Sequence, residues 1–258
     1  MRWSYSRLSS FKNCPYEFYL NYIVNDPETY PNEGNFYAEN GSLVHETLEK
    51  YFNGELTLDE AAEFYVRQFD EQVFYRAKQS IVDKKFEACA DYLATVDFDW
   101  LKDYEILGVE KELTFGIAGK EFIAYIDLLI RDKDSGDIIV IDHKSAACPV
   151  GKSGKVLKNH QETFESHKRQ GYIYAAAVYQ NFGMFPKVLA WNHFADGGKF
   201  MEVLFDEQEY NAVMSWVGNT IREIEQEEDF EPNLNFFYCT QLCGYRNVCE
   251  YAESAEWK

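Results

Sequence analysis

The chain has 258 residues, of which 46% are hydrophobic and 17% aromatic, and this composition supports a large buried core. With 25 basic and 44 acidic residues its formal charge is −19, which excludes a protein that grips nucleic acid through overall positive charge. The sequence MRWSYSRLSSFKNC lacks the apolar stretch of a secretion signal, and the most apolar run, FIAYIDLLI, contains Asp127, so we expect a cytoplasmic protein with no membrane span.

The first hundred residues have the spacing of helices. An aromatic-rich helix is predicted to start at a cap at Ser9 or Ser10, and a polar loop follows it over residues 25–40. A second helix is predicted to start at Ser42. Residues 57–100 interleave acidic and apolar positions at spacings of three and four, which indicates further helices.

The pattern changes to alternation near residue 104, where glycines at 116, 119 and 136 mark the turns of a three-stranded meander. Helical spacing returns over 167–183, followed by strands at 187–195 and 200–205 and an acidic helix at 206–228. This order predicts an α/β fold with one mixed sheet. We predict a single domain over 1–258, with a helical elaboration at about 40–105, a core at about 106–205, and a C-terminal helix and cysteine cluster at 206–258.

The stretch DIIVIDHKSAA places an acid, an imidazole and an amine at the end of a buried strand. If the hairpin before it is symmetric about the loop DKDSGD, Asp127 faces Asp142, with Cβ atoms about 5 Å apart. Two such carboxylates repel each other unless a cation lies between them, and carboxylate oxygens suit Mg²⁺ or Mn²⁺. Alternation puts Lys144 on the face of Asp142 and His143 on the opposite face. The pattern predicts phosphodiester hydrolysis; the alternative is a set of ordinary surface charges.

Three further features flank this strand. Gln170 and Tyr174 are four residues apart and share one helical face, which two surface polar groups would also do. His45 lies among apolar helical positions, where a histidine is often part of the core. If its helix packs over the hairpin, His45 is instead a candidate nitrogen ligand for the metal. A glycine-containing basic segment is predicted to contact phosphates; the alternative is a solvated loop with no partner. Its candidate DNA-binding residues are Lys152, Lys155, Lys158, Lys168 and Arg169.

The cysteines gather near the C-terminus with the spacing C-x3-C-x5-C, at Cys239, Cys243 and Cys249. A tetrahedral thiolate site needs a fourth ligand, and Cys14 shares the same aromatic context. Thiolates hold zinc or an iron–sulfur cluster, and spacing alone does not choose between them. Core thiols without metal are the remaining alternative.

Six motifs in this order resemble the PD-(D/E)xK nuclease superfamily in its RecB-like branch: SYSRLSSFKNCPYEFYL, GSLVHETLEKY, YIDLLI, VIDHKS, RQGYIY and the terminal cysteines. The iron–sulfur nucleases of the AddB type and the CRISPR-adaptation exonucleases are the most similar subgroup. This resemblance implies a restriction-endonuclease-like core with a mixed sheet between helices. The subgroup spaces its last cysteines C-x2-C-x5-C, so this chain departs from it by one residue.

The resemblance also implies roles for individual residues. His45, Asp127 and Asp142 would bind Mg²⁺ or Mn²⁺ together with the main-chain carbonyl of His143, and Glu110 falls near a further acidic position of the family. Lys144 would be the active-site lysine, helped by the Q-x3-Y pair Gln170 and Tyr174. A [4Fe–4S] cluster, or alternatively zinc, would be held by Cys14, Cys239, Cys243 and Cys249.

These implications predict a metal-dependent deoxyribonuclease that acts on single strands or DNA ends, in recombination, repair or CRISPR and phage DNA processing. The sequence contains no G-x4-G-K-[ST] phosphate loop, so a helicase, recombinase or integrase-type protein is a possible partner. The alternative function is a non-catalytic DNA- or protein-binding subunit that uses the same fold and cysteine cluster as architecture.

Overall fold

The computed structural model of the chain describes residues 2–75 and 77–254; Met1, Arg76 and 255–258, which the predicted domain includes, lie outside the described residues. The N-terminal part is helical, as predicted, and contains α1 (Tyr5–Asn13), α2 (Pro15–Phe18), a π-helical turn (Tyr19–Val24), α3 (Phe36–Phe52), α4 (Leu58–Gln72) and α5 (Gln79–Thr95). No helix in the described part of the chain is both long enough and apolar enough to cross a membrane.

The predicted starts of the first two helices are wrong. The cap of α1 is Ser4, whose side chain accepts a hydrogen bond from the backbone of Arg7, and the cap of α3 is Asn35. Both caps have extended backbone where the chain enters the helix, whereas Ser42 lies within α3. Any serine or asparagine just before a helical stretch can cap the free backbone N–H groups of its first turn. The residue type alone therefore does not fix where the helix starts.

Five strands form one mixed sheet in the order β1 (Tyr104–Ile117), β2 (Lys120–Asp132), β3 (Ile138–His143), β4 (Val188–His193) and β5 (Lys199–Leu204). All neighbours are antiparallel except β3 and β4, which are parallel and are joined through α6 (Gln161–Phe182). The helix α7 (Glu207–Gln226) follows β5. This arrangement confirms the predicted α/β fold with a mixed sheet flanked by helices.

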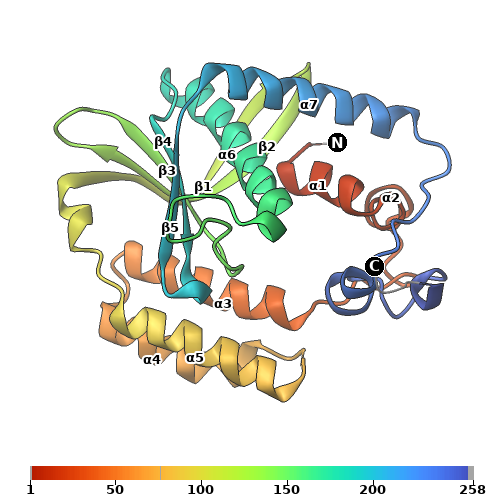
Figure 1. Cartoon of the computed structure of the whole chain (residues 1–258), viewed down its shortest axis with the longest axis horizontal. Helices are drawn as coiled ribbons and strands as arrows, with labels where there is room; N and C mark the ends of the chain where they lie inside the picture. Colours follow the sequence, from red (N-terminus) through yellow and green to blue (C-terminus); the bar gives the residue numbers. More distant parts are fainter. Residues whose placement is uncertain (1, 76, 255–258) are drawn as a thin grey trace.

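Helices cover both faces of the sheet (Figure 1). On one face, α1, α6 and α7 share a core with residues such as Phe122, Val140 and Trp191. On the other face, alternate strand residues such as Ile141 pack against Phe52 of α3. The helices α3, α4 and α5 also form a core of their own on that side. The two faces explain why neighbouring residues at the end of β3 have different surroundings.

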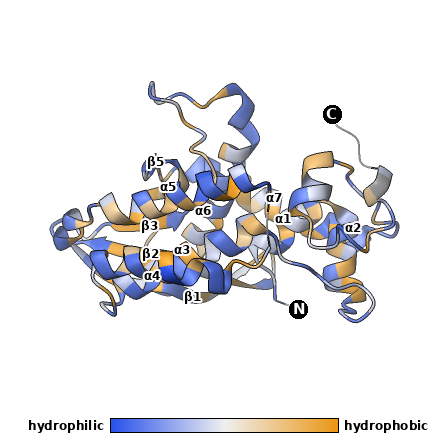
Figure 2. Cartoon of the chain, turned by 90° about the horizontal axis from the view of Figure 1, so that it is seen from below, coloured by the Kyte–Doolittle hydropathy of each residue, from blue (hydrophilic) through white to orange (hydrophobic). Residues whose placement is uncertain are grey.

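The segments that begin and end the described chain lie side by side at one end of the molecule, as Figures 1 and 2 show for α2 and the C-terminal turns. Hydrogen bonds join them: the Tyr16 hydroxyl donates to Glu250 at 2.9 Å and the Tyr238 hydroxyl donates to Glu17 at 2.5 Å. The terminal cysteines are therefore brought close to Cys14 by contacts that involve no metal.

Gly171 marks a close approach between α6 and the sheet, because a Cβ atom there would lie 2.8 Å from a ring carbon of Trp191. Glycine to alanine in a helix interior ordinarily stabilises a protein by up to about 1 kcal/mol. At Gly171 we expect the opposite sign, a loss of about 1–2 kcal/mol in the free energy of unfolding, from overpacking.

Gly218 in α7 is the matched control, since its added Cβ would meet Ala118 at an ordinary 3.7 Å. Denaturant unfolding of Gly171→Ala and Gly218→Ala measures the contrast. A Gly171→Ala protein as stable as Gly218→Ala would contradict the close packing of α6 on Trp191.

Candidate active site

Three carboxylates lie in a row across β1, β2 and β3. The β2–β3 ladder pairs Leu128 with Ile141, which is the predicted register, and Asp127 and Asp142 are the next residues on the two strands. On the other side of β2, Glu110 lies opposite Asp127, between two consecutive pairs of the β1–β2 ladder. The sheet thus collects one acid from each of three adjacent strands at the same level.

Glu110 has a left-handed backbone, with a φ of 44°, in the middle of β1. A non-glycine residue in this region is strained by about 1–3 kcal/mol, and such strain concentrates at functional sites. Sequence reasoning connected Glu110 with the site only through the resemblance. A sharper signal was present, because a two-residue turn at Ala118 and Gly119, with φ of 51° and 74°, makes a symmetric hairpin in which 110 faces 127.

His45 on α3 reaches the same row of acids. Its Nδ1 atom lies 3.5 Å from Glu110 Oε1 and 3.6 Å from Asp127 Oδ2, and its Nε2 atom lies 3.1 Å from the carbonyl oxygen of His143. Ligand atoms of His45, Glu110 and Asp127 all fall within 4.8 Å of one another. One imidazole and two carboxylates are a donor set that suits Mn²⁺ or Mg²⁺.

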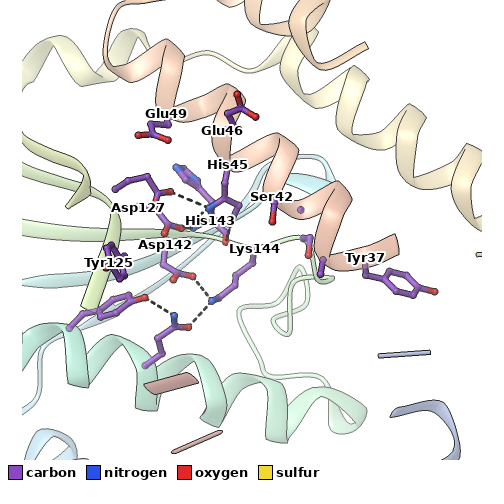
Figure 3. Close-up of a pocket in the computed structure, with 16 residues that line it drawn as sticks. Tyr37, Ser42, His45, Glu46, Glu49, Tyr125, Asp127, Asp142, His143 and Lys144 are labelled. Carbon is purple, nitrogen blue, oxygen red and sulfur yellow. Dashed lines mark hydrogen bonds and ion pairs between the residues drawn. The ribbon is translucent and has the colours of Figure 1, made fainter. Parts of the chain in front are cut away.

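Asp142 and Lys144 form the second half of the site (Figure 3). The Lys144 ammonium lies 2.7 Å from Asp142 Oδ2 as an ion pair, although that buried oxygen has no hydrogen-bond donor in line with it. Lys144 donates to the Gln170 side-chain oxygen at 2.6 Å, and the Gln170 amide lies 2.7 Å from the Tyr174 hydroxyl. The predicted Q-x3-Y pair therefore holds the lysine in place.

His143 contributes its backbone to this site and points its ring away from it. The backbone N–H donates to Asp127 Oδ2 at 2.6 Å. The ring stacks on Phe52 at a centroid distance of 5.8 Å and its Nδ1 lies 3.1 Å from the Asn192 amide. This placement agrees with the alternation read from the sequence, which left the carbonyl of His143 as the useful atom.

Burial makes the charges of this site costly. Burial, followed by the Asp142 carboxylate, raises the pKa of Asp127 well above its usual value. Burial alone would lower the pKa of His45, but Glu110, Asp127 and Asp142 outweigh it and raise that pKa. Three acids, Glu110, Asp127 and Asp142, lie close together here. Among the described residues, the one lysine or arginine that forms an ion pair with them is Lys144, through Asp142, so negative charge is in excess at the site. A divalent cation would relieve this repulsion, so the residues fit a metal.

The predicted DNA-binding cations do not form one group. Lys152, Lys155 and Lys158 are exposed on the loop before α6. Lys168 instead pairs with Glu209 at 2.9 Å, and Arg169 pairs with Glu162 at 2.9 Å. These two cations of α6 are already engaged by acids, which the linear charge pattern could not show.

The four predicted cluster ligands Cys14, Cys239, Cys243 and Cys249 line one small enclosed cavity between the two chain ends. Cys14 joins α1 to α2, and Cys243 follows the π-helical turn Tyr238–Leu242. Burial, followed by the Glu17 carboxylate, raises the pKa of the Cys243 thiol to about 12. Four soft sulfur donors around one cavity fit an iron–sulfur cluster or zinc.

The family model described as "PD-(D/E)XK nuclease superfamily" matches residues 2–250. A crystal structure from Eubacterium rectale, described provisionally as an exonuclease, is 16% identical with a TM-score of 0.51, covering 100% of this chain and 89% of that one. The structure of SSO0001 is also 16% identical, with a TM-score of 0.32, and covers 82% of this chain and 84% of that one. At these identities the likeness to solved structures concerns the fold. No curated protein matches the sequence.

Proposed function

Since the chain belongs to the PD-(D/E)XK nuclease superfamily, we propose that it is a divalent-metal-dependent deoxyribonuclease that hydrolyses phosphodiester bonds in single strands or at DNA ends. The observation that carries this proposal is the row of acids from three adjacent strands beside a lysine held by Gln170. We place the chain in the RecB-like branch, near the AddB-type and CRISPR-adaptation nucleases.

The metal would be held by His45, Glu110, Asp127 and Asp142, together with the carbonyl oxygen of His143. Once bound, a divalent cation would lower the pKa of a water molecule and neutralise charge on the phosphate. The protein contributes the positions: Asp142 and Gln170 hold the Lys144 ammonium at the edge of the acid row. From there Lys144 can offset charge that develops on the phosphate oxygens or donate to a water molecule.

We also propose that Cys14, Cys239, Cys243 and Cys249 ligate a [4Fe–4S] cluster, with Zn²⁺ as the alternative. Their shared cavity and the soft sulfur donor set support this proposal. Because the cavity joins α2 to the C-terminal turns, a bound cluster would fasten the chain ends next to each other. Its proposed role is structural.

The test of the nuclease proposal is cleavage of a labelled single-stranded oligonucleotide by metal-depleted protein, before and after Mg²⁺ or Mn²⁺ is added. We expect cleavage with either metal and none with a chelator. Asp127→Asn, purified in parallel, controls for contaminating nucleases, because it removes one negative charge from the proposed metal site.

The alternative function is a subunit that binds DNA or a protein without cleaving it. This alternative predicts oligonucleotide binding with no metal-dependent cleavage by the wild type. Equal cleavage by the wild type and Asp127→Asn would instead contradict the assignment of Asp127 to the metal site.

A further inference from the structure

The active-site cavity has one acidic side and one side with little net charge. On the acidic side, α3 contributes Glu46 and Glu49 to its lining, beyond the row of acids (Figure 3). On the other side lie Lys144 and Gln170. A polyanion is repelled by the first side, so a nucleic-acid strand must approach the reaction centre from the side of Lys144.

A groove continues from that side along α1. A hollow of about 400 Å³ is lined by Lys144 and Gln170, which it shares with the active-site cavity, and by Ser9 and Asn13 of α1. A second hollow of about 660 Å³ shares Ser9 and Asn13 with the first and extends to Trp216 of α7. We name these two hollows the α1 groove, and each has the size of a ligand-binding pocket.

Aromatic rings follow the α1 groove. Phe237 lines its outer hollow, is 44% exposed, and lies 6.4 Å in centroid distance from Tyr37, which lines the active-site cavity. Trp216 lines the same hollow, with the Arg169 guanidinium 5.2 Å from its ring centroid. Phe237 is the exposed ring of the two, whereas Trp216 is half-buried and packs against the core. Accessible ring faces are platforms on which unpaired bases stack, irrespective of base sequence.

The polar lining of the α1 groove is mostly uncharged. Serine and asparagine side chains of α1 provide donors and acceptors along it, and the cations at its border are engaged: Lys12 pairs with Glu223 and Arg169 with Glu162. Glu17, an acid in its lining, is engaged as well, because it accepts a hydrogen bond from the Tyr238 hydroxyl. The groove therefore offers ring faces and neutral hydrogen-bonding groups, and its cations are held by acids.

We propose that the α1 groove is the track along which one single strand of DNA reaches Lys144, with its bases stacked on Phe237 and Trp216. This inference rests on the proposed nuclease function and adds the path and the mode of recognition. A base pair hides the faces that these rings need, so the groove selects single strands and frayed ends over intact duplex.

The test compares Phe237→Ala with Phe200→Ala, a ring 42% exposed on β5 outside the groove. Binding of a fluorescent oligo(dT) is measured by anisotropy with no Mg²⁺ or Mn²⁺ added, so that no cleavage is expected and the cysteine cavity keeps its own metal. We expect Phe237→Ala to weaken binding by about 5- to 100-fold, the effect of one lost stacking contact, and Phe200→Ala to leave it unchanged. The slope of log K against log salt should be shallow, about −0.7 to −1.4, for one or two neutralised phosphates.

Kinetics separate this proposal from the nuclease proposal. With metal, Phe237→Ala should raise the KM for oligo(dT), whereas Phe200→Ala should leave both that KM and the rate of hydrolysis of the small diester bis(p-nitrophenyl) phosphate at the wild-type values. Absence of hydrolysis in every protein would overturn the nuclease proposal and leave the binding result standing. Equal oligo(dT) binding by wild type and Phe237→Ala would overturn the groove proposal. A loss of duplex binding in Phe237→Ala as large as its loss of oligo(dT) binding would also overturn it. The same holds for a steep salt slope that is lost when Lys152, Lys155 and Lys158 become alanine.

Discussion

Replacing Lys144 by alanine is expected to lower the rate of metal-dependent cleavage by about 10²- to 10⁴-fold. The ammonium is positioned by two partners, Asp142 at 2.7 Å and Gln170 at 2.6 Å, so its removal takes away a charge that is held ready beside the acid row. Single-turnover cleavage of an oligonucleotide at saturating enzyme measures the loss without the influence of product release.

Metal binding distinguishes this effect from a damaged site. Lys144→Ala removes the positive neighbour of Asp142, so Mn²⁺ should bind as well as in the wild type or more tightly. Asp127→Asn should lose both Mn²⁺ affinity and cleavage. Lys84→Ala, on the exposed face of α5, is the control for loss of a lysine elsewhere. If Lys144→Ala cleaves at the wild-type rate, the lysine has no part in the reaction.

Replacing Cys243 by serine is expected to release the metal bound by the cysteine cavity and to lower the melting temperature by about 6–12 °C. For a chain of this size, each kcal/mol lost from the free energy of unfolding lowers the melting temperature by about 2–4 °C, so the shift corresponds to a loss of about 3 kcal/mol. Structural metal sites contribute at least this much to stability. Thermal unfolding and metal analysis of the same preparations give the two readouts. Iron with acid-labile sulfide identifies a cluster, and zinc identifies the alternative.

Cys148→Ala is the control, because this buried cysteine lies outside the cavity. It should retain the full metal content. If wild-type protein purified without exposure to oxygen or chelator contains neither iron nor zinc, the four cysteines are core thiols. In that case the serine variant should change the melting temperature only through the lost burial of one sulfur atom.

Local sequence rules predicted the strands of the site and their register. The loop between β2 and β3 holds turn-forming residues, and its centre alone placed Leu128 opposite Ile141. Alternation then separated Asp142 from the ring of His143. These predictions depend on residues close together in the chain, where turn geometry and period two leave few alternatives.

Features that depend on distant packing were less accessible. His45 reaches the acids only because α3 lies against the open end of the sheet, and helical spacing says nothing about where a helix docks. Lys168 is held by Glu209, which lies on α7, so its availability to DNA could not be judged from the basic segment that contains it. The left-handed backbone of Glu110 likewise has no signature in the hydrophobic pattern.

The left-handed backbone of Glu110 means that the residue best for thermal stability at this position differs from the residue needed for catalysis. Glycine or asparagine would adopt a φ of 44° with less strain than glutamate, so a screen for thermostable variants will favour them at position 110. Each such variant would lose a carboxylate that faces Asp127 and His45. Engineering of this protein for high temperature should therefore hold Glu110 constant and seek stability elsewhere, for example by helix-interior glycine replacement in α7.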